Sequence, residues 1–226
     1  MKALAVLVSL LSLALVPMWG GEAEAKRLAD STSTLTEIMG VADKGIPKDL
    51  MDKASCAIVV PGVKKGGFIV AAKYGRGFAS CRGSIGGWRA PAPIRVEGGS
   101  VGFQIGGSGT DVVMLVMSQK GMEKLTSSKF TLGGDASVAG GPVGREANAQ
   151  TDASMHADIL SWSKSRGVFA GVALDGATLR PDTDATKALY GSALDNKDIV
   201  EGKVKTPDAA KDFIGTLDRI SPKQVK

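Results

Sequence analysis

Paired glycines divide the middle of this chain into short segments with the character of strands. The chain has 30 glycines among 226 residues, and in its middle Gly-Gly pairs begin at positions 66, 86, 98, 106, 133 and 140. Glycine permits turns, bulges and close backbone contacts that larger residues obstruct. The apolar runs between the pairs lie at 56–60, 67–74, 94–105 and 111–118. This alternation predicts a strand meander.

Helical patterns flank this β-rich region on both sides. An amphipathic pattern ends near Gly40, and Pro47 marks the start of a second short helix. A short helix is expected at 119–127, extended segments at 130–139 and 167–180, and helices at 184–194 and 207–220. The order predicts one α+β domain with a mostly antiparallel, glycine-rich sheet flanked by N-terminal and C-terminal helices.

The first 25 residues have the pattern of a secretory signal peptide. Lys2 precedes an apolar run from Ala3 to Val16, and Ala23-Glu24-Ala25 matches a cleavage site. The run has 14 residues, fewer than the roughly 20 that span a bilayer. We therefore expect removal of residues 1–25 and a single domain at 26–226. The expected location is the periplasm or cell surface, with the protein soluble or peripheral to the membrane.

Two cysteines, Cys56 and Cys81, lie 25 residues apart in apolar sequence. A disulfide between them is one interpretation, since an exported chain reaches an oxidising compartment. Two buried free thiols in one core are the other interpretation. Neither cysteine belongs to a C-x-x-C motif, which argues against a thioredoxin-like redox site.

Signals for catalysis and cofactors are weak. His156 is the only histidine, which excludes histidine-rich metal sites. The sequence at 106–110 approaches a nucleophile elbow but ends in Thr110 instead of glycine, and no phosphate-binding loop or dinucleotide fingerprint occurs. We expect no cofactor, no metal and no catalysis. A hydrolase that pairs His156 with Asp111 or Asp135 is the weakest alternative.

Residues 53–96 carry eight basic residues and no acidic ones. Basic residues near aromatic ones suit an anionic lipid surface, with Trp88 as an interfacial anchor. In the alternative, strand alternation spreads the charges over different faces, the aromatic residues are core, and the charge serves solubility. Nucleic acid is not an expected partner of an exported protein. The predicted lipid-binding residues are Lys64, Lys65, Lys73, Arg76, Arg82, Trp88, Arg89 and Arg95.

Blocks of the sequence that cover most of residues 30–220 resemble the SYLF family. The blocks start with Gly66 to Val70, Trp88 to Ile94, and Val101 to Gly107 with Thr110 and Asp111. They continue with Phe130 to Arg145, Trp162 to Val172, and Ala188 to Gly191. Trp162 stands where the family often has tyrosine.

The resemblance implies binding to membrane lipids, with phosphoinositides as ligands of eukaryotic members and actin as a ligand of some fungal ones. It implies no catalytic residues. For an exported bacterial protein, the expected partner is ordinary anionic phospholipid. The alternative is a structural or protein-interaction domain of the envelope.

Overall fold

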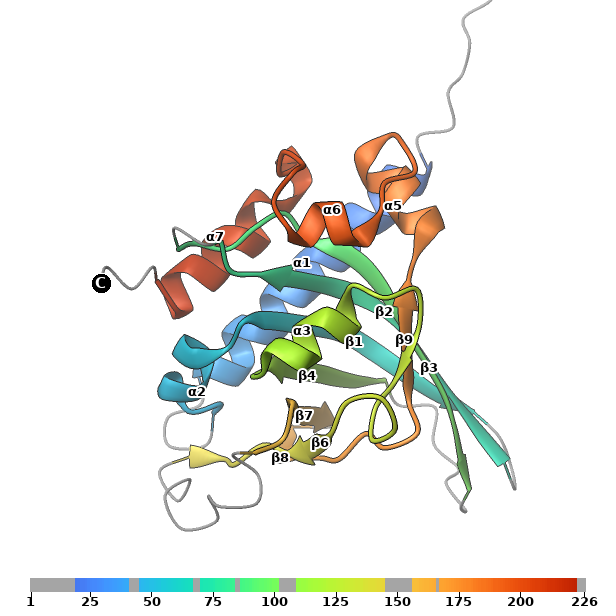
Figure 1. The fold of residues 1–226 in the computed structure, drawn as a ribbon, viewed down its shortest axis with the longest axis vertical. Coiled ribbons are helices and arrows are strands. Elements are labelled where there is room, and N and C mark those ends of the chain that lie inside the picture. The colour runs from blue at the N-terminus through green and yellow to red at the C-terminus, as the bar shows by residue number, and fades with distance from the viewer. Residues whose placement is uncertain are drawn as a thin grey trace, which may run out of the picture.

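The structure is a computed structural model that describes residues 19–40, 45–66, 70–83, 86–101, 109–144, 156–165 and 167–222. Most of the expected signal peptide, residues 1–18, and the glycine pair at 106 lie outside these ranges. A curled, mostly antiparallel sheet is flanked by helices from both ends of the chain (Figure 1), which confirms the predicted α+β class.

The described elements keep the predicted order of helices first, a strand-rich middle and helices last, and they add an unpredicted strand at Ile159–Ser165 and an unpredicted helix at Asn196–Val200. The helices are α1 (Trp19–Gly40), α2 (Lys48–Lys53), α3 (Gln119–Leu125), α5 (Thr183–Tyr190), α6 (Asn196–Val200) and α7 (Lys211–Ile220), with a 3-10 turn at Asp208–Ala210. The strands are β1 (Cys56–Gly66), β2 (Val70–Cys81), β3 (Ala92–Val101), β4 (Thr110–Val116), β5 (Phe130–Thr131), β6 (Val138–Gly140), β7 (Ile159–Ser165), β8 (Val168–Gly171) and β9 (Thr178–Pro181).

The described strands form one sheet in the order β5-β9-β3-β2-β1-β4-β7-β6, and β8 also pairs with β7. Among the described pairings, only β6 with β7 is parallel. The sequence pattern does not predict β7, because serines interrupt its apolar residues. Ser161 is fully buried there, and its hydroxyl donates to the carbonyl of Val172. This hydrogen bond explains how a polar residue occupies a central strand.

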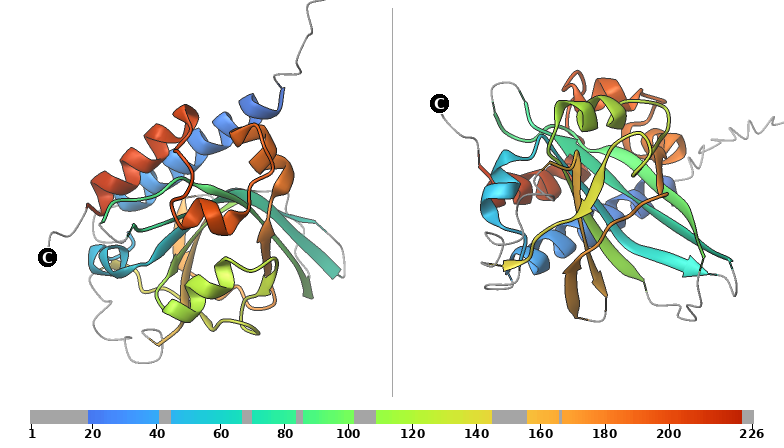
Figure 2. Two further views of the ribbon diagram at one scale, coloured as in Figure 1. Left: turned by 45° about the horizontal axis from the view of Figure 1, so that its top comes forward. Right: turned by 60° about the horizontal axis from the view of Figure 1, so that its bottom comes forward.

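Both faces of the central strands are buried, which is why β1 and β4 read as continuous apolar runs. Ile58 and Val60 of β1 face a core that includes Leu125 of α3 and Ile199 of α6. Val59 faces the opposite core, which α1 and α7 cover. Figure 2 shows α1 and α7 side by side over the sheet. The result is a three-layer arrangement with the sheet in the middle.

Helix α1 begins before the expected start of the domain. Leu28, Leu35 and Ile38 form its buried stripe, as the amphipathic pattern predicts. The helix also includes the expected cleavage site, and Glu24 is only 3 % exposed. Within the described residues, no helix combines the length and apolar character that crossing a bilayer requires.

Candidate functional site

The predicted lipid-binding residues do not form one surface. Lys64, Lys65 and Lys73 lie where β1 and β2 pair near their hairpin end, with Lys65 opposite Lys73. Arg82 follows the other end of β2, nine residues beyond Lys73, which corresponds to roughly 30 Å along a strand. Arg76 of β2 and its partner Arg95 on β3 lie between these ends. The basic segment is therefore spread along the length of the sheet.

The side chains of Trp88 and Arg82 make contacts within the fold instead of facing solvent. The Trp88 side chain is 6 % exposed, and its indole nitrogen donates to the Ser221 carbonyl at 3.2 Å. The Arg82 guanidinium lies 4.4 Å from the centre of the Trp88 ring and donates to the carbonyls of Ala54 and Met51. The expectation that Trp88 anchors the protein in a membrane is therefore wrong for this conformation, because its ring is packed inside the core.

Arg89 is also engaged within the fold. Its Nη1 donates to the carbonyl of Val200 at 2.9 Å, and its side chain packs beside Gly202. Arg82 and Arg89 thus satisfy backbone carbonyls at the end of the sheet near α2, α6 and α7. We therefore do not retain Arg82, Arg89 and Trp88 as candidate lipid-binding residues.

Three arginines line up across neighbouring strands on one face of the sheet. Arg76 of β2 pairs with Arg95 of β3, which in turn pairs with Arg180 of β9. Residues paired in this way project from the same face, at a strand spacing of roughly 4.8 Å. Between 30 % and 35 % of each side chain is exposed. We call Arg76, Arg95 and Arg180 the arginine row.

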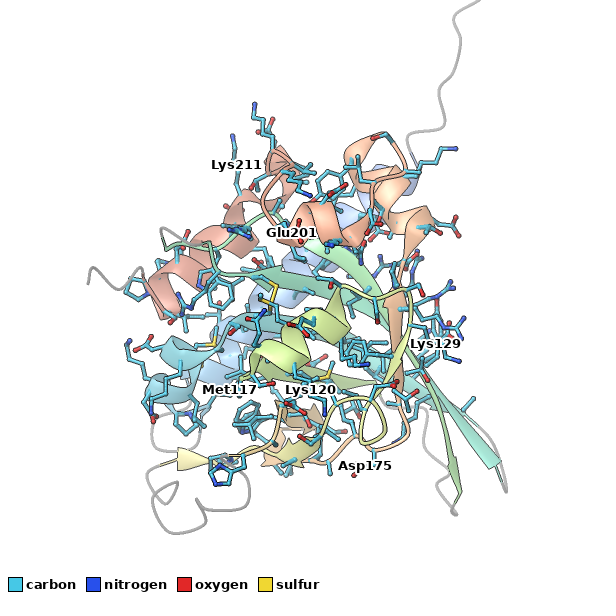
Figure 3. The ribbon with its side chains drawn as sticks, viewed as in Figure 1. Met117, Lys120, Lys129, Asp175, Glu201 and Lys211 are labelled. Atoms are coloured by element: carbon cyan, nitrogen blue, oxygen red, sulfur yellow. A yellow bond between two sulfur atoms is a disulfide. The ribbon has the colours of Figure 1, made fainter. Side chains whose placement is uncertain are left out.

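Lys129 extends the arginine row at the edge of the sheet. It precedes Phe130, which pairs with Leu179 of β9, so Lys129 comes next to Arg180. Figure 3 labels Lys129 beside β9, on the side of the sheet where many side-chain nitrogens gather. Four cations from four adjacent segments therefore meet along one line.

Asp182 fixes the position of Arg76. The carboxylate accepts from Nη2 of Arg76 at 2.9 Å and from the backbone N–H of Ala185 at 3.2 Å, which caps α5. Burial opposes ionisation of Asp182, but these hydrogen bonds outweigh it, so the pKa of Asp182 is lowered. Arg76 also lies 3.9 Å from Glu24 of α1. Its charge is thus balanced within the fold.

Arg95 and Arg180 share a single carboxylate. The Nε atoms of Arg95 and Arg180 each lie 3.1 Å from a different oxygen of Glu97. In the described part of the chain, no other carboxylate forms an ion pair with either arginine. In close ion pairs, this half of the arginine row has two cations for one carboxylate, and Asp182 acts on Arg95 from a longer range.

An open groove of about 530 Å³ runs beside α1. Its charged lining is mixed, with both cations and carboxylates. Arg27 in the groove and Arg76 in the row both contact Glu24, which connects the two regions. The lining residues are Ala23, Lys26, Arg27, Asp30, Ser33, Thr34, Glu37, Pro61, Gly62 and Asp111.

The residues of the hydrolase alternative serve local structure. Asp111 accepts from the backbone N–H of Gly62, and Asp135 accepts from that of Thr131. Among the described residues, no hydrogen bond joins His156 to either carboxylate, and no cluster of three or more metal-ligating side chains occurs. The arrangement gives no support to nucleophilic or metal-assisted hydrolysis.

Cys56 and Cys81 form a disulfide in the structure. The two residues are direct partners across the β1–β2 pair, and both side chains are buried. The bond thus links the start of β1 to the end of β2, next to the contacts of Arg82 and Trp88. The disulfide interpretation, and not the pair of free thiols, describes this structure.

Replacing Asp182 with alanine is expected to cost about 2 to 3 kcal/mol of folding free energy, because it removes the α5 cap and leaves Arg76 without its main partner. Since the pKa of Asp182 is lowered by folding, its contribution is present above the ordinary value of 3.8 and is lost as the pH falls through the folded value. Urea unfolding at neutral and acidic pH measures both effects.

Asp184→Ala is the matched control, because Asp184 is exposed in the first turn of α5 and its removal changes the net charge equally. Its expected cost is below about 1 kcal/mol. Equal costs for the two variants would contradict the assigned role of Asp182.

The sequence could not have identified the arginine row. Arg180 and Asp182 lie outside the basic segment, and Glu97 follows its last residue. No short motif connects Arg95 with Arg180, since their proximity depends on the pairing of β9 with β3. Only the sheet topology brings these residues together.

Comparison with known proteins places the chain in a family. The model of the Ysc84 family, described as "Las17-binding protein actin regulator", matches residues 97–220. Protein YSC84 of Saccharomyces cerevisiae is 33 % identical over 180 residues, which cover 78 % of this chain and 38 % of that protein. An SH3 domain-containing protein of Schizosaccharomyces pombe is 36 % identical, with coverage of 78 % and 42 %.

The human relative, SH3 domain-containing YSC84-like protein 1, is 33 % identical over 205 residues, which cover 89 % of this chain and 60 % of that protein. The chain thus spans roughly 40 to 60 % of the length of these relatives. The family match begins at Glu97 within β3 and covers all of β9, so it includes Glu97 and Arg180 but not Arg95. The chain belongs to the Ysc84 family, the SYLF-domain family that its glycine-rich blocks resemble.

Proposed function

We propose that this protein binds anionic phospholipid at a membrane surface through its arginine row, without catalysis, as an exported protein of the bacterial envelope. One observation carries the proposal: Arg76, Arg95 and Arg180 lie in register on one partly exposed face, and Arg95 and Arg180 share one carboxylate. Such a face attracts the phosphates of lipid headgroups. The signal-peptide pattern supports export.

The binding mode is electrostatic. Each basic residue near an anionic membrane contributes about 1 kcal/mol, and the attraction decays within a Debye length of roughly 8 Å at physiological salt. Lys64 of β1 and Tyr74 of β2 are exposed and paired with each other, and Tyr74 lies on the same strand as Arg76. They place a further cation and an aromatic ring near the same membrane. Binding of this kind is reversible and sensitive to salt.

A protein partner is the second candidate. One Saccharomyces cerevisiae relative carries the name "LAS seventeen-binding protein 3", and the family is described as "Las17-binding protein actin regulator", which both refer to recognition of a protein. In this chain, β8 is a short outer strand that pairs with β7, and Val168 on it is 69 % exposed. A strand edge with an exposed apolar side chain suits recognition of another protein. An envelope protein would be the partner in this case.

Vesicle co-sedimentation of the full chain tests the lipid proposal. Removing two basic contacts by Arg95→Gln with Arg180→Gln is expected to weaken binding to phosphatidylglycerol vesicles by about 2 kcal/mol, or roughly 30-fold. Binding of the unaltered chain is expected to fall at high salt and to be weak on phosphatidylcholine alone. The apolar segment 3–16 is present in every variant and contributes equally to vesicle binding. Differences in binding between variants therefore reflect the substituted residues.

The matched control removes two exposed lysines from other elements, Lys197 on α6 and Lys211 on α7, by replacement with glutamine. This variant has the same net charge as the arginine variant, and its binding is expected to change less than threefold. Equal loss in both variants would indicate attraction by net charge alone. Unchanged binding in the arginine variant would overturn the proposal and favour the protein partner.

A further inference from the structure

Glu97 lies between two arginines in an arrangement that leaves both guanidinium groups incompletely satisfied. Its two oxygens each lie 3.1 Å from one Nε atom, of Arg95 on one side and of Arg180 on the other. Both Nε atoms are buried, and neither makes a hydrogen bond of good geometry. A guanidinium normally binds a carboxylate with two parallel N–H groups. Glu97 therefore offsets one of the two positive charges of this pair without completing its hydrogen bonds.

The charges of the cluster favour an additional anion. Arg95 and Arg180 share one carboxylate in close ion pairs, whereas Asp182 forms its close ion pair with Arg76 and acts on Arg95 only from a longer range. A phosphate monoester carries about 1.5 to 2 negative charges and three acceptor oxygens. It can therefore accept from both guanidinium groups at once, which a single carboxylate does not achieve here. Phosphate is the chemical group that fits this pair.

The pair is accessible from solvent. Arg95 and Arg180 are direct partners on adjacent strands, and about one third of each side chain is exposed. Glu97 is exposed to a similar extent, so its side chain can turn outward when another anion arrives. Lys129, exposed at the edge next to Arg180, provides a further cation for a bound phosphate.

We infer that Arg95 and Arg180 form a binding site for the phosphate of a phospholipid headgroup, and that Glu97 occupies this site as an internal competitor when no lipid is bound. The inference rests on the proposed function. It adds which two arginines bind the headgroup phosphate and how Glu97 regulates this binding. Glu97 weakens binding to any surface of low phosphate density and so restricts the protein to membranes rich in anionic lipid. A phosphomonoester headgroup, with its higher charge, displaces Glu97 more readily than a phosphodiester.

The test compares full-chain variants on vesicles that contain either phosphatidic acid, a monoester, or phosphatidylglycerol, a diester. Glu97→Gln removes the competitor, and its binding is expected to tighten roughly fivefold on both lipids. The unaltered chain is expected to prefer phosphatidic acid, and this preference is expected to shrink in Glu97→Gln. Glu123→Gln on α3 is the matched control, with an expected change below twofold.

A further variant combines Glu97→Gln with Arg95→Gln and Arg180→Gln, and the gain is expected to disappear. Circular dichroism confirms that each variant is folded. Calorimetric titration with inorganic phosphate and with glycerol phosphate identifies the source of the ligand. Weak binding of both, against strong binding to vesicles, supports a membrane ligand. Tight binding of inorganic phosphate would assign the site to free phosphate and overturn the lipid part of the inference.

The outcomes separate this inference from the proposed function. If Glu97→Gln does not change vesicle binding while the arginine variant loses it, Glu97 is not a competitor and the lipid function remains. If neither variant changes vesicle binding, both proposals fail. Tighter binding by Glu123→Gln as well would show that net charge, and not the position of Glu97, determines affinity.

Discussion

Replacing Gly171 with alanine is expected to destabilise the folded chain by about 3 kcal/mol or more. A Cβ atom at Gly171 would overlap the carbonyl oxygen of Gly141, where the ends of β6 and β8 meet. Backbone atoms cannot move aside as a flexible side chain can. The backbone N–H groups of Gly141 and Val172 both donate to the Ser161 carbonyl, so a shift would break these hydrogen bonds. Urea unfolding followed by tryptophan fluorescence measures the loss.

Gly134→Ala provides the control for the same chemical change. The nearest atoms to a Cβ at Gly134 belong to Thr131, and they lie at ordinary contact distances of 3.7 Å or more. Its expected effect on the free energy of unfolding is below about 1 kcal/mol. Similar losses for the two variants would mean that the crossing of β6 and β8 is looser than described.

Removing the disulfide is expected to cost about 3 kcal/mol. The bond closes a segment with a sequence separation of 25 residues, and a cross-link of this length restricts the unfolded chain by roughly that amount. The double variant Cys56→Ala with Cys81→Ala is expected to unfold at a correspondingly lower urea concentration. Because both sulfurs are buried, a reductant is expected to act on the native protein only slowly, through unfolding.

Adding a reductant to the double variant provides the control, since its stability is then expected to stay constant. In the unaltered chain, the reductant is expected to lower the urea midpoint toward that of the double variant. A double variant as stable as the unaltered chain would show that packing alone, including the contact of Arg82 with Trp88, secures this end of the sheet.

The fold could be predicted where local sequence determines structure. The apolar runs at 56–60 and 111–118 became β1 and β4, and Pro47 directly precedes α2. β7 could not be predicted from its alternation of apolar residues and serines, since Ser161 is buried through a hydrogen bond to a distant carbonyl. Tertiary partners, and not propensity, determine that strand.

The glycine-rich blocks gain a physical explanation from packing. Gly141, Trp162 and Gly171 lie in separate parts of the sequence but meet at one point. A Cβ atom at Gly141 would overlap the Trp162 ring, whose indole nitrogen donates to the Pro142 carbonyl. Only a residue without a side chain fits on both sides of this crossing. Packing in this chain thus requires glycine at both positions.

The candidate site was predicted only in part. The excess of positive charge in 53–96 points to β2 and β3, which carry two residues of the proposed arginine row, yet charge counts do not show what each residue contacts. Arg82 and Arg89 bind backbone carbonyls and Trp88 is core, whereas Arg180 enters the site through the pairing of β9. Such pairing between distant segments is not encoded by local spacing.

Helix α1 also determines when the expected cleavage after Ala25 can take place. Proteases act on exposed, locally unfolded segments, but this bond lies inside a helix beside the buried Glu24. A peptidase that cuts there must therefore act before the domain has folded. The cut would remove Glu24, the carboxylate that contacts both Arg27 and Arg76. If processing precedes folding, the domain folds without Glu24. The groove and the arginine row then have one negative charge fewer.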